Sequence, residues 1–131
     1  MTIFRALYTI VCLTLLSGCD PGHRGKTVLN NQTSYPIKLT YSTYFIKDTI
    51  ILLNPFSVTE VFDFGGLGAG KDYNCCLCEF EKISLATVDT LKVISKSIND
   101  SKNWLISNGN KKRFSHQEIT CSFLIEPQDV H

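Results

Sequence analysis

Four cysteines carry the most reactive chemistry of this chain: Cys75, Cys76 and Cys78 lie close together, and Cys121 lies much farther along. In a domain exported from the cytoplasm such thiols are expected to form disulfides. On an extended strand Cys76 and Cys78 share one face, and Cys75 points to the other. We therefore predict one disulfide from Cys121 to either Cys76 or Cys78. Cys75 is left outside it, because a bond to its neighbour Cys76 would strain the backbone.

The same sulfur atoms offer an alternative, a thiolate metal site. Structural zinc sites use cysteines two to four residues apart on turns that let both sulfurs converge, whereas cysteines on one strand splay their sulfurs. Copper(I) is softer and accepts fewer ligands, so metal binding stays an alternative, with Cys75, Cys76, Cys78 and Cys121 as ligands. We predict no metal or other cofactor. Because successive cysteines are spaced by one and two residues, we also expect no redox centre of the CxxC type.

Acidic residues and histidine offer little for catalysis. Glu79 and Glu81 are predicted to share one strand face, and paired carboxylates can cleave glycosides, but outward acids on a polar face are normally only solvated. His116 lies beside Ser115 and Glu118, whereas the members of a catalytic triad converge from separate segments. We predict no catalytic residue, and a hydrolase that uses Glu79 and Glu81 or His116 is the alternative function.

A glycine-rich stretch, GGLGAGKD at residues 65–72, comes close to the phosphate-binding P-loop. Gly65, Gly70 and Lys71 match that motif, but Asp72 stands where a Ser or Thr hydroxyl would bind magnesium. A P-loop also opens a helix, and the residues that follow here are strand-like. We interpret the stretch as a flexible hairpin loop and predict no nucleotide.

The start of the chain has the layout of an export signal. A short segment with one basic residue, Arg5, precedes an apolar run from Ala6 to Leu16. Eleven helical residues span about 16 Å, roughly half the hydrocarbon core of a bilayer. That is too short for a transmembrane helix but typical of the hydrophobic region of a signal peptide.

The run ends in Leu16-Ser17-Gly18-Cys19, which resembles the lipobox of bacterial lipoproteins. The resemblance implies that the chain is cut between Gly18 and Cys19, that the Cys19 thiol is diacylglycerylated, and that the new amine receives a fatty acid such as palmitate. Three fatty chains make attachment effectively permanent. We therefore expect a lipid anchor in the cell envelope, with the outer membrane or the cell surface favoured over the inner membrane. The sequence does not indicate which leaflet of the membrane holds the anchor.

Three segments follow from this cut: a signal peptide (1–18), a flexible tether (19–26) and one domain (27–131). The tether reads DPGHRGK after Cys19, and such a mixture of Pro, Gly and charge is typical of a linker. Once Arg5 is removed with the signal peptide, 12 of the 13 Lys and Arg residues remain, and their charges are balanced by 12 Asp and Glu residues. A nearly neutral chain without a basic stripe argues against binding to nucleic acid.

The rest of the chain indicates strands. Within residues 37–45, every second side chain is expected on one buried face of a sheet, namely Ile37, Leu39, Tyr41, Thr43 and Phe45. In the last stretch Cys121, Phe123 and Ile125 share a face in the same way. Residues 48–54 and 57–64 flank a short turn and are predicted to form a hairpin, with Val58, Phe62 and Phe64 on one face. Further strands are expected at 75–80, 83–87, 90–95 and 103–107.

Seven to nine short strands without a sustained helical period predict an all-β fold. We expect an antiparallel β-sandwich of Ig-like or Greek-key type after the N-terminal signal helix, with a small barrel as the alternative. The layout resembles small uncharacterised β-sandwich lipoproteins of Gram-negative envelopes, and this resemblance implies no activity.

Aromatic and hydroxyl residues suggest ligands and modification. Trp104, Tyr41, Tyr44 and Tyr73 are candidates for a glycan or peptide surface, although a lone tryptophan in a sandwich is more often core. Thr49 and Thr90 lie in Asp-Thr-Ile and Asp-Thr-Leu tripeptides. These resemble O-glycosylation acceptors of some Gram-negative envelopes.

Together these features predict a non-enzymatic accessory or partner-binding module of the envelope. Its partners would be the membrane, through acylated Cys19, and another envelope protein or a glycan.

Overall fold

A computed structural model describes residues 22–66, 73–109 and 117–131 of the chain. These residues form seven strands: β1 (His23–Asn31), β2 (Ile37–Thr43), β3 (Thr49–Leu53), β4 (Ser57–Gly66), β5 (Phe80–Thr87), β6 (Trp104–Asn108) and β7 (Gln117–Ile125). Three short 3₁₀ turns, at Cys76–Glu79, Ser101–Asn103 and Pro127–Asp129, are the only helical elements of the described part. None of them is long enough to cross a bilayer.

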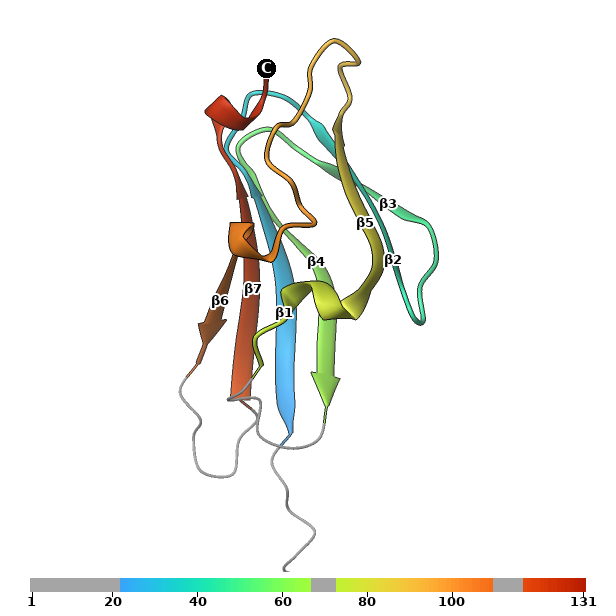
Figure 1. The fold of residues 1–131 in the computed structure, drawn as a ribbon, viewed down its shortest axis with the longest axis vertical. Helices are drawn as coiled ribbons and strands as arrows, with labels where there is room; N and C mark the ends of the chain where they lie inside the picture. Colours follow the sequence, from blue (N-terminus) through green and yellow to red (C-terminus); the bar gives the residue numbers. More distant parts are fainter. Residues whose placement is uncertain (1–21, 67–72, 110–116) are drawn as a thin grey trace, which may run out of the picture.

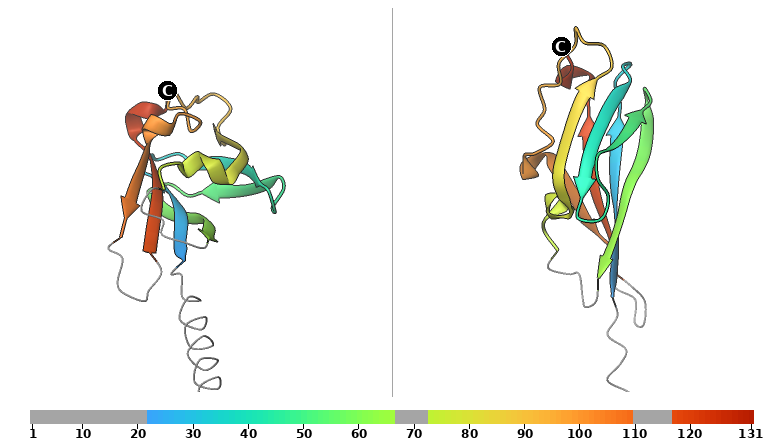
Figure 2. Two further views of the ribbon diagram at one scale, coloured as in Figure 1. Left: turned by 60° about the horizontal axis from the view of Figure 1, so that its bottom comes forward. Right: turned by 90° about the vertical axis from the view of Figure 1, so that its right-hand side faces the viewer.

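The strands form two sheets that face each other, one in the order β4-β1-β7-β6 and the other in the order β3-β2-β5. Figure 1 shows both layers, and in the second view of Figure 2 the three-stranded sheet lies in front of β1 and β7. Every neighbouring pair is antiparallel except β1 and β7, which run parallel. The predicted all-β sandwich is confirmed, with seven strands, the lower end of the expected range.

The core lies between the inner faces of the two sheets. The predicted alternation holds in β2, where Ile37, Leu39 and Tyr41 are buried, and in β7, where Cys121, Phe123 and Ile125 are buried. Alternate side chains of a strand point to one face, so each strand contributes every second residue. Trp104 packs against Phe123 with 5.2 Å between ring centroids. Its indole N–H donates to the carbonyl of Ile98 at 2.8 Å, so this tryptophan belongs to the core.

The predicted hairpin between 48–54 and 57–64 is wrong. β3 pairs with β2 in one sheet, whereas β4 pairs with β1 in the other, so the short connection crosses between the sheets. Phe56 adopts a φ of 52° in this connection. A short turn signal shows that the chain reverses direction, but it does not show which strand becomes the neighbour.

The prediction that Val58, Phe62 and Phe64 share one face of the strand is also wrong. The register of β4 against β1 shifts between Thr27 and Val28, which leaves Val61 as an extra residue in β4. A bulge of this kind reverses the inward and outward alternation beyond it. Val58 is therefore 68% exposed, while Val61 and Phe64 are buried.

Strand β1 begins at His23, inside the stretch 19–26 that was predicted to be a tether. His23 already pairs with Gly66 of β4 and with Gln117 of β7, so both edges of β1 are held from its first residue. Gly25 is a packing position, because a Cβ there would collide with the ring of Phe64. The glycine content suggested a flexible linker here, whereas Gly25 is needed because the ring of Phe64 packs directly against its backbone.

Two further stretches differ from the strands predicted for them. Residues 90–95 contribute only an isolated bridge, between Ile94 and Val130. The cysteine-rich stretch folds as the 3₁₀ turn Cys76–Glu79 ahead of β5. The signal helix, the lipobox, most of the glycine-rich stretch and His116 lie outside the described residues.

Candidate functional site

The first candidate site is the cysteine turn, which we define as residues 75–79. Two disulfides meet there, one between Cys75 and Cys78 and one between Cys76 and Cys121. Cys76 and Cys121 are 4% and 0% exposed, whereas Cys78 is exposed and Cys75 is partly exposed. The turn therefore carries one buried and one accessible sulfur pair.

The prediction that Cys75 stays outside any disulfide is wrong. A 3₁₀ turn brings residues three apart onto one side, and the Cα atoms of Cys75 and Cys78 are only 5.4 Å apart. These two residues form a CxxC pair in which Cys76 occupies one middle position. The spacings between successive cysteines hid this pair, and a comparison of every cysteine with every other would have found it. All four of these sulfurs are therefore bonded in pairs, and neither pair leaves a free thiol.

Tyr73 links the cysteine turn to the end of the four-stranded sheet. Its ring stacks on Phe64 with 5.0 Å between centroids, and its hydroxyl donates to the Glu79 carboxylate at 3.3 Å. Burial, then the negative charge of Glu79 and the hydrogen bond to it, raise the pKa of Tyr73 above its ordinary value. The phenol is therefore held in its neutral form.

We expect Tyr73→Phe to weaken the alkaline destabilisation of the protein. The raised pKa means that the folded state keeps a proton that the unfolded chain releases, so this stability is complete below the unfolded pKa of about 10 and is lost as pH rises above it. One proton sets a limit of about 1.4 kcal/mol per pH unit, and partial exposure reduces it. Urea unfolding between pH 9 and pH 11 measures both slopes, and equal slopes would contradict the prediction.

The two acids of the hydrolase alternative have different partners. Glu79 accepts the hydrogen bond of Tyr73 from the cysteine turn, whereas Glu81 in β5 forms an ion pair with Lys47. They lie on different elements, a 3₁₀ turn and a strand, and do not share one strand face as predicted. Within the described ranges, no cluster of three or more His, Cys, Asp or Glu side chains is arranged to hold a metal ion.

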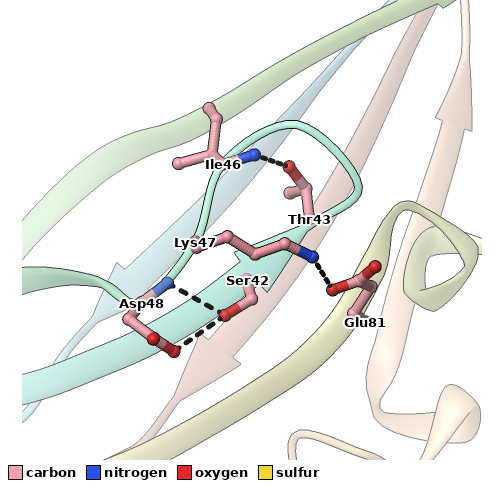
Figure 3. Close-up of polar contacts among 6 residues, drawn as sticks. All are labelled: Ser42, Thr43, Ile46, Lys47, Asp48 and Glu81. Atoms are coloured by element: carbon pink, nitrogen blue, oxygen red, sulfur yellow. Dashed lines mark hydrogen bonds and ion pairs between the residues drawn. The ribbon is translucent and has the colours of Figure 1, made fainter.

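The second candidate site is the aromatic loop, residues 44–48, between β2 and β3. Polar contacts order it from several sides (Figure 3). Ser42 Oγ accepts from the Asp48 N–H at 3.0 Å and donates to the Asp48 carboxylate at 3.2 Å. The Ile46 N–H donates to Thr43 Oγ1 at 3.0 Å, while Lys47 reaches across to Glu81.

This ordered loop presents two large rings to solvent. Tyr44 and Phe45 are 78% and 87% exposed, and their rings pack edge to face at 5.1 Å. Figures 1 and 2 show the connection between β2 and β3 standing out from the body of the sandwich. Phe45 was predicted to face inward with residues 37–43, but β2 ends at Thr43, so the alternation stops before it.

Only one of the four predicted surface aromatics is freely exposed. Trp104 and Tyr41 are buried, and the Tyr41 hydroxyl donates to the carbonyl of Val61 at 3.2 Å. Tyr73 is partly buried in the stack described above, which leaves Tyr44. Both predicted glycosylation acceptors lie in the described part: Thr90 is exposed in a turn, whereas Thr49 is partly buried in β3, opposite Tyr41.

The outer face of the four-stranded sheet carries a shallow concavity of about 220 Å³. It is lined largely by paired charges, with Arg24 and Asp63 at 3.4 Å and Lys26 and Glu60 at 3.5 Å. Exposed pairs of this kind contribute about 0–1 kcal/mol and are common on strand surfaces, so they do not indicate a ligand.

Comparison of the whole chain with protein-family models, with curated proteins and with solved structures found no match.

Proposed function

We propose that this protein is a lipid-anchored module of the bacterial cell envelope that binds a partner protein through the aromatic loop and has no enzymatic activity of its own. The observation that carries the proposal is the high exposure of Tyr44 and Phe45 on a loop that is already ordered (Figure 3). The anchor rests on the export signal and the lipobox that ends in Cys19.

Exposed aromatic pairs on an ordered loop suit a binding surface. Tyrosine is enriched among the residues that dominate interface energies, and aromatic residues bring a large contact area. Ordering the loop before binding reduces the entropy lost on association. The contacts of Ser42, Thr43 and Lys47 supply this order in the unbound protein.

A protein partner fits this surface better than a glycan. The next strand, β3, is an edge strand of its sheet, and its side chains Ile50 and Leu52 are also exposed. Exposed aliphatic side chains on the strand that follows the two rings favour an apolar partner, and an edge strand offers main-chain groups for pairing with an added strand. Glycans would require more polar groups around the rings than Ile50 and Leu52 provide.

Cys19→Ala tests the anchor. We expect the wild-type protein in the membrane fraction, with an acylated Cys19 as its first residue in mass spectrometry. The variant should stay uncut or leave the membrane, because no thiol remains to receive lipid. An intact Met1 on the wild-type protein in membranes would contradict the anchor without bearing on the loop.

Site-specific photo-crosslinking tests the loop. A benzophenone side chain at Phe45 in intact cells is expected to capture one protein of defined mass, and Tyr44→Ser in the same chain should reduce the yield at least tenfold. The matched control carries the same group at Leu105, which is also exposed but lies on β6 of the other sheet. Equal capture from both positions, or none from Phe45, would contradict the proposal.

A further inference from the structure

The two disulfides of the cysteine turn differ in how well a reductant can reach them. Cys76 and Cys121 belong to the hydrophobic core, at 4% and 0% exposure. Cys78, by contrast, is exposed, and its partner Cys75 is partly exposed. Disulfide exchange requires a thiolate to approach one sulfur directly, so access controls the rate. Only one of the two bonds can be attacked while the protein stays folded.

The two bonds also differ in what they hold together. Cys76–Cys121 joins residues 45 apart and links the turn to β7, whereas Cys75–Cys78 joins residues three apart within the turn. A short closed loop restricts the unfolded chain less than a long one. Opening the short bond therefore leaves the sheets and their buried crosslink intact.

From these differences we propose that the Cys75–Cys78 disulfide is a reversible thiol–disulfide exchange site for an external dithiol, while Cys76–Cys121 is a permanent structural crosslink. This role is independent of the aromatic loop and of the lipid anchor.

The exchange takes place in two balanced steps. A thiolate of the dithiol attacks the sulfur of Cys78, the more exposed residue of the pair; the Cys75–Cys78 bond breaks, and Cys75 leaves as a thiolate that takes up a proton. The second thiol of the reductant, as its thiolate, attacks the mixed disulfide and releases the Cys78 thiolate, which is also protonated. Two electrons have passed to the protein, and the reductant has become a disulfide. An oxidised dithiol reverses both steps.

The buried crosslink is protected from internal exchange with the freed thiols. A Cys75–Cys76 bond would join Cα atoms about 3.8 Å apart, below the usual range for disulfides. Cys121 is fully buried in β7, so its sulfur is closed to attack from outside the core. We therefore expect reduction of the exposed pair to stop at that pair.

Differential alkylation of the wild-type full chain tests the proposal. The protein is treated with 1 mM dithiothreitol, quenched with iodoacetamide at increasing times, and analysed by peptide mass spectrometry. We expect Cys75 and Cys78 to be labelled at least 100-fold faster than Cys76 and Cys121, with unchanged far-UV circular dichroism. Equal rates for both pairs, faster labelling of the buried pair, or opening of Cys75–Cys78 only together with unfolding would overturn it. Labels on Cys12 or Cys19 fall in separate peptides and report only on the lipid anchor.

Two single variants provide a matched comparison. Cys75→Ser leaves a thiol at the exposed Cys78, and Cys121→Ser leaves one at the buried Cys76. We expect the first to react with an aromatic disulfide reagent at least 100-fold faster than the second. If Cys121→Ser does not fold, the wild-type alkylation rates decide alone. Reoxidation of the reduced wild-type protein must restore Cys75–Cys78, and a different pairing would overturn the reversible role.

Discussion

Replacing Cys76 and Cys121 together by alanine is expected to lower the free energy of unfolding by about 4 kcal/mol, since the bond closes a loop with a sequence separation of 45. That is a large share of the ~5–15 kcal/mol by which a domain is normally stable. The midpoint of thermal unfolding should fall by on the order of 15 °C. Urea unfolding monitored by circular dichroism and a calorimetric scan measure both quantities.

The double variant Cys75→Ala, Cys78→Ala is the matched control. Its bond spans a sequence separation of three, so the same chain-entropy model predicts a loss of only about 2 kcal/mol. Equal losses in the two double variants would show that loop size does not govern the stability of this domain.

Asn31→Ala is expected to lower the free energy of unfolding by about 3 kcal/mol. Asn31 is fully buried at the end of β1, and its amide nitrogen donates to the carbonyls of Tyr35 at 2.8 Å, Asn54 at 3.1 Å and Leu53 at 3.3 Å. Its side-chain oxygen accepts from the Thr33 N–H at 3.1 Å and from the Thr33 hydroxyl at 2.8 Å. Alanine leaves several buried groups without a partner, each at a cost of about 1–3 kcal/mol.

Two variants sharpen this test by urea unfolding. Asn30→Ala changes a partly exposed asparagine on the same strand and should stay within about 0.5 kcal/mol of the wild type. Asn31→Asp should be at least as destabilising as Asn31→Ala, because it places a carboxylate against the carbonyls of Leu53 and Asn54. A wild-type stability in Asn31→Asp would contradict the role of Asn31 as the donor that holds the crossing between β3 and β4.

The class of fold and the inward faces of the regular strands could be predicted from the pattern of apolar and polar residues alone. Ile37, Leu39 and Tyr41 in β2, and Cys121, Phe123 and Ile125 in β7, are buried as their spacing predicted. The period of two is a local property of an extended chain, so nearest neighbours in sequence are enough to find it. The sequence also indicated a disulfide among the four cysteines, but it left more than one pairing possible.

The choice of neighbouring strands could not be predicted in this way and is known from the three-dimensional arrangement. β3 and β4 are separated by three residues but belong to different sheets, and Val61 reverses the alternation of β4 because it has no partner residue in β1. The cysteine turn pairs Cys75 with Cys78 because it folds as a 3₁₀ turn. The local sequence was equally compatible with a strand, in which these two residues would point to opposite faces. Strand partners, bulges and turns of this kind depend on contacts between residues far apart in the sequence, which a local pattern does not contain.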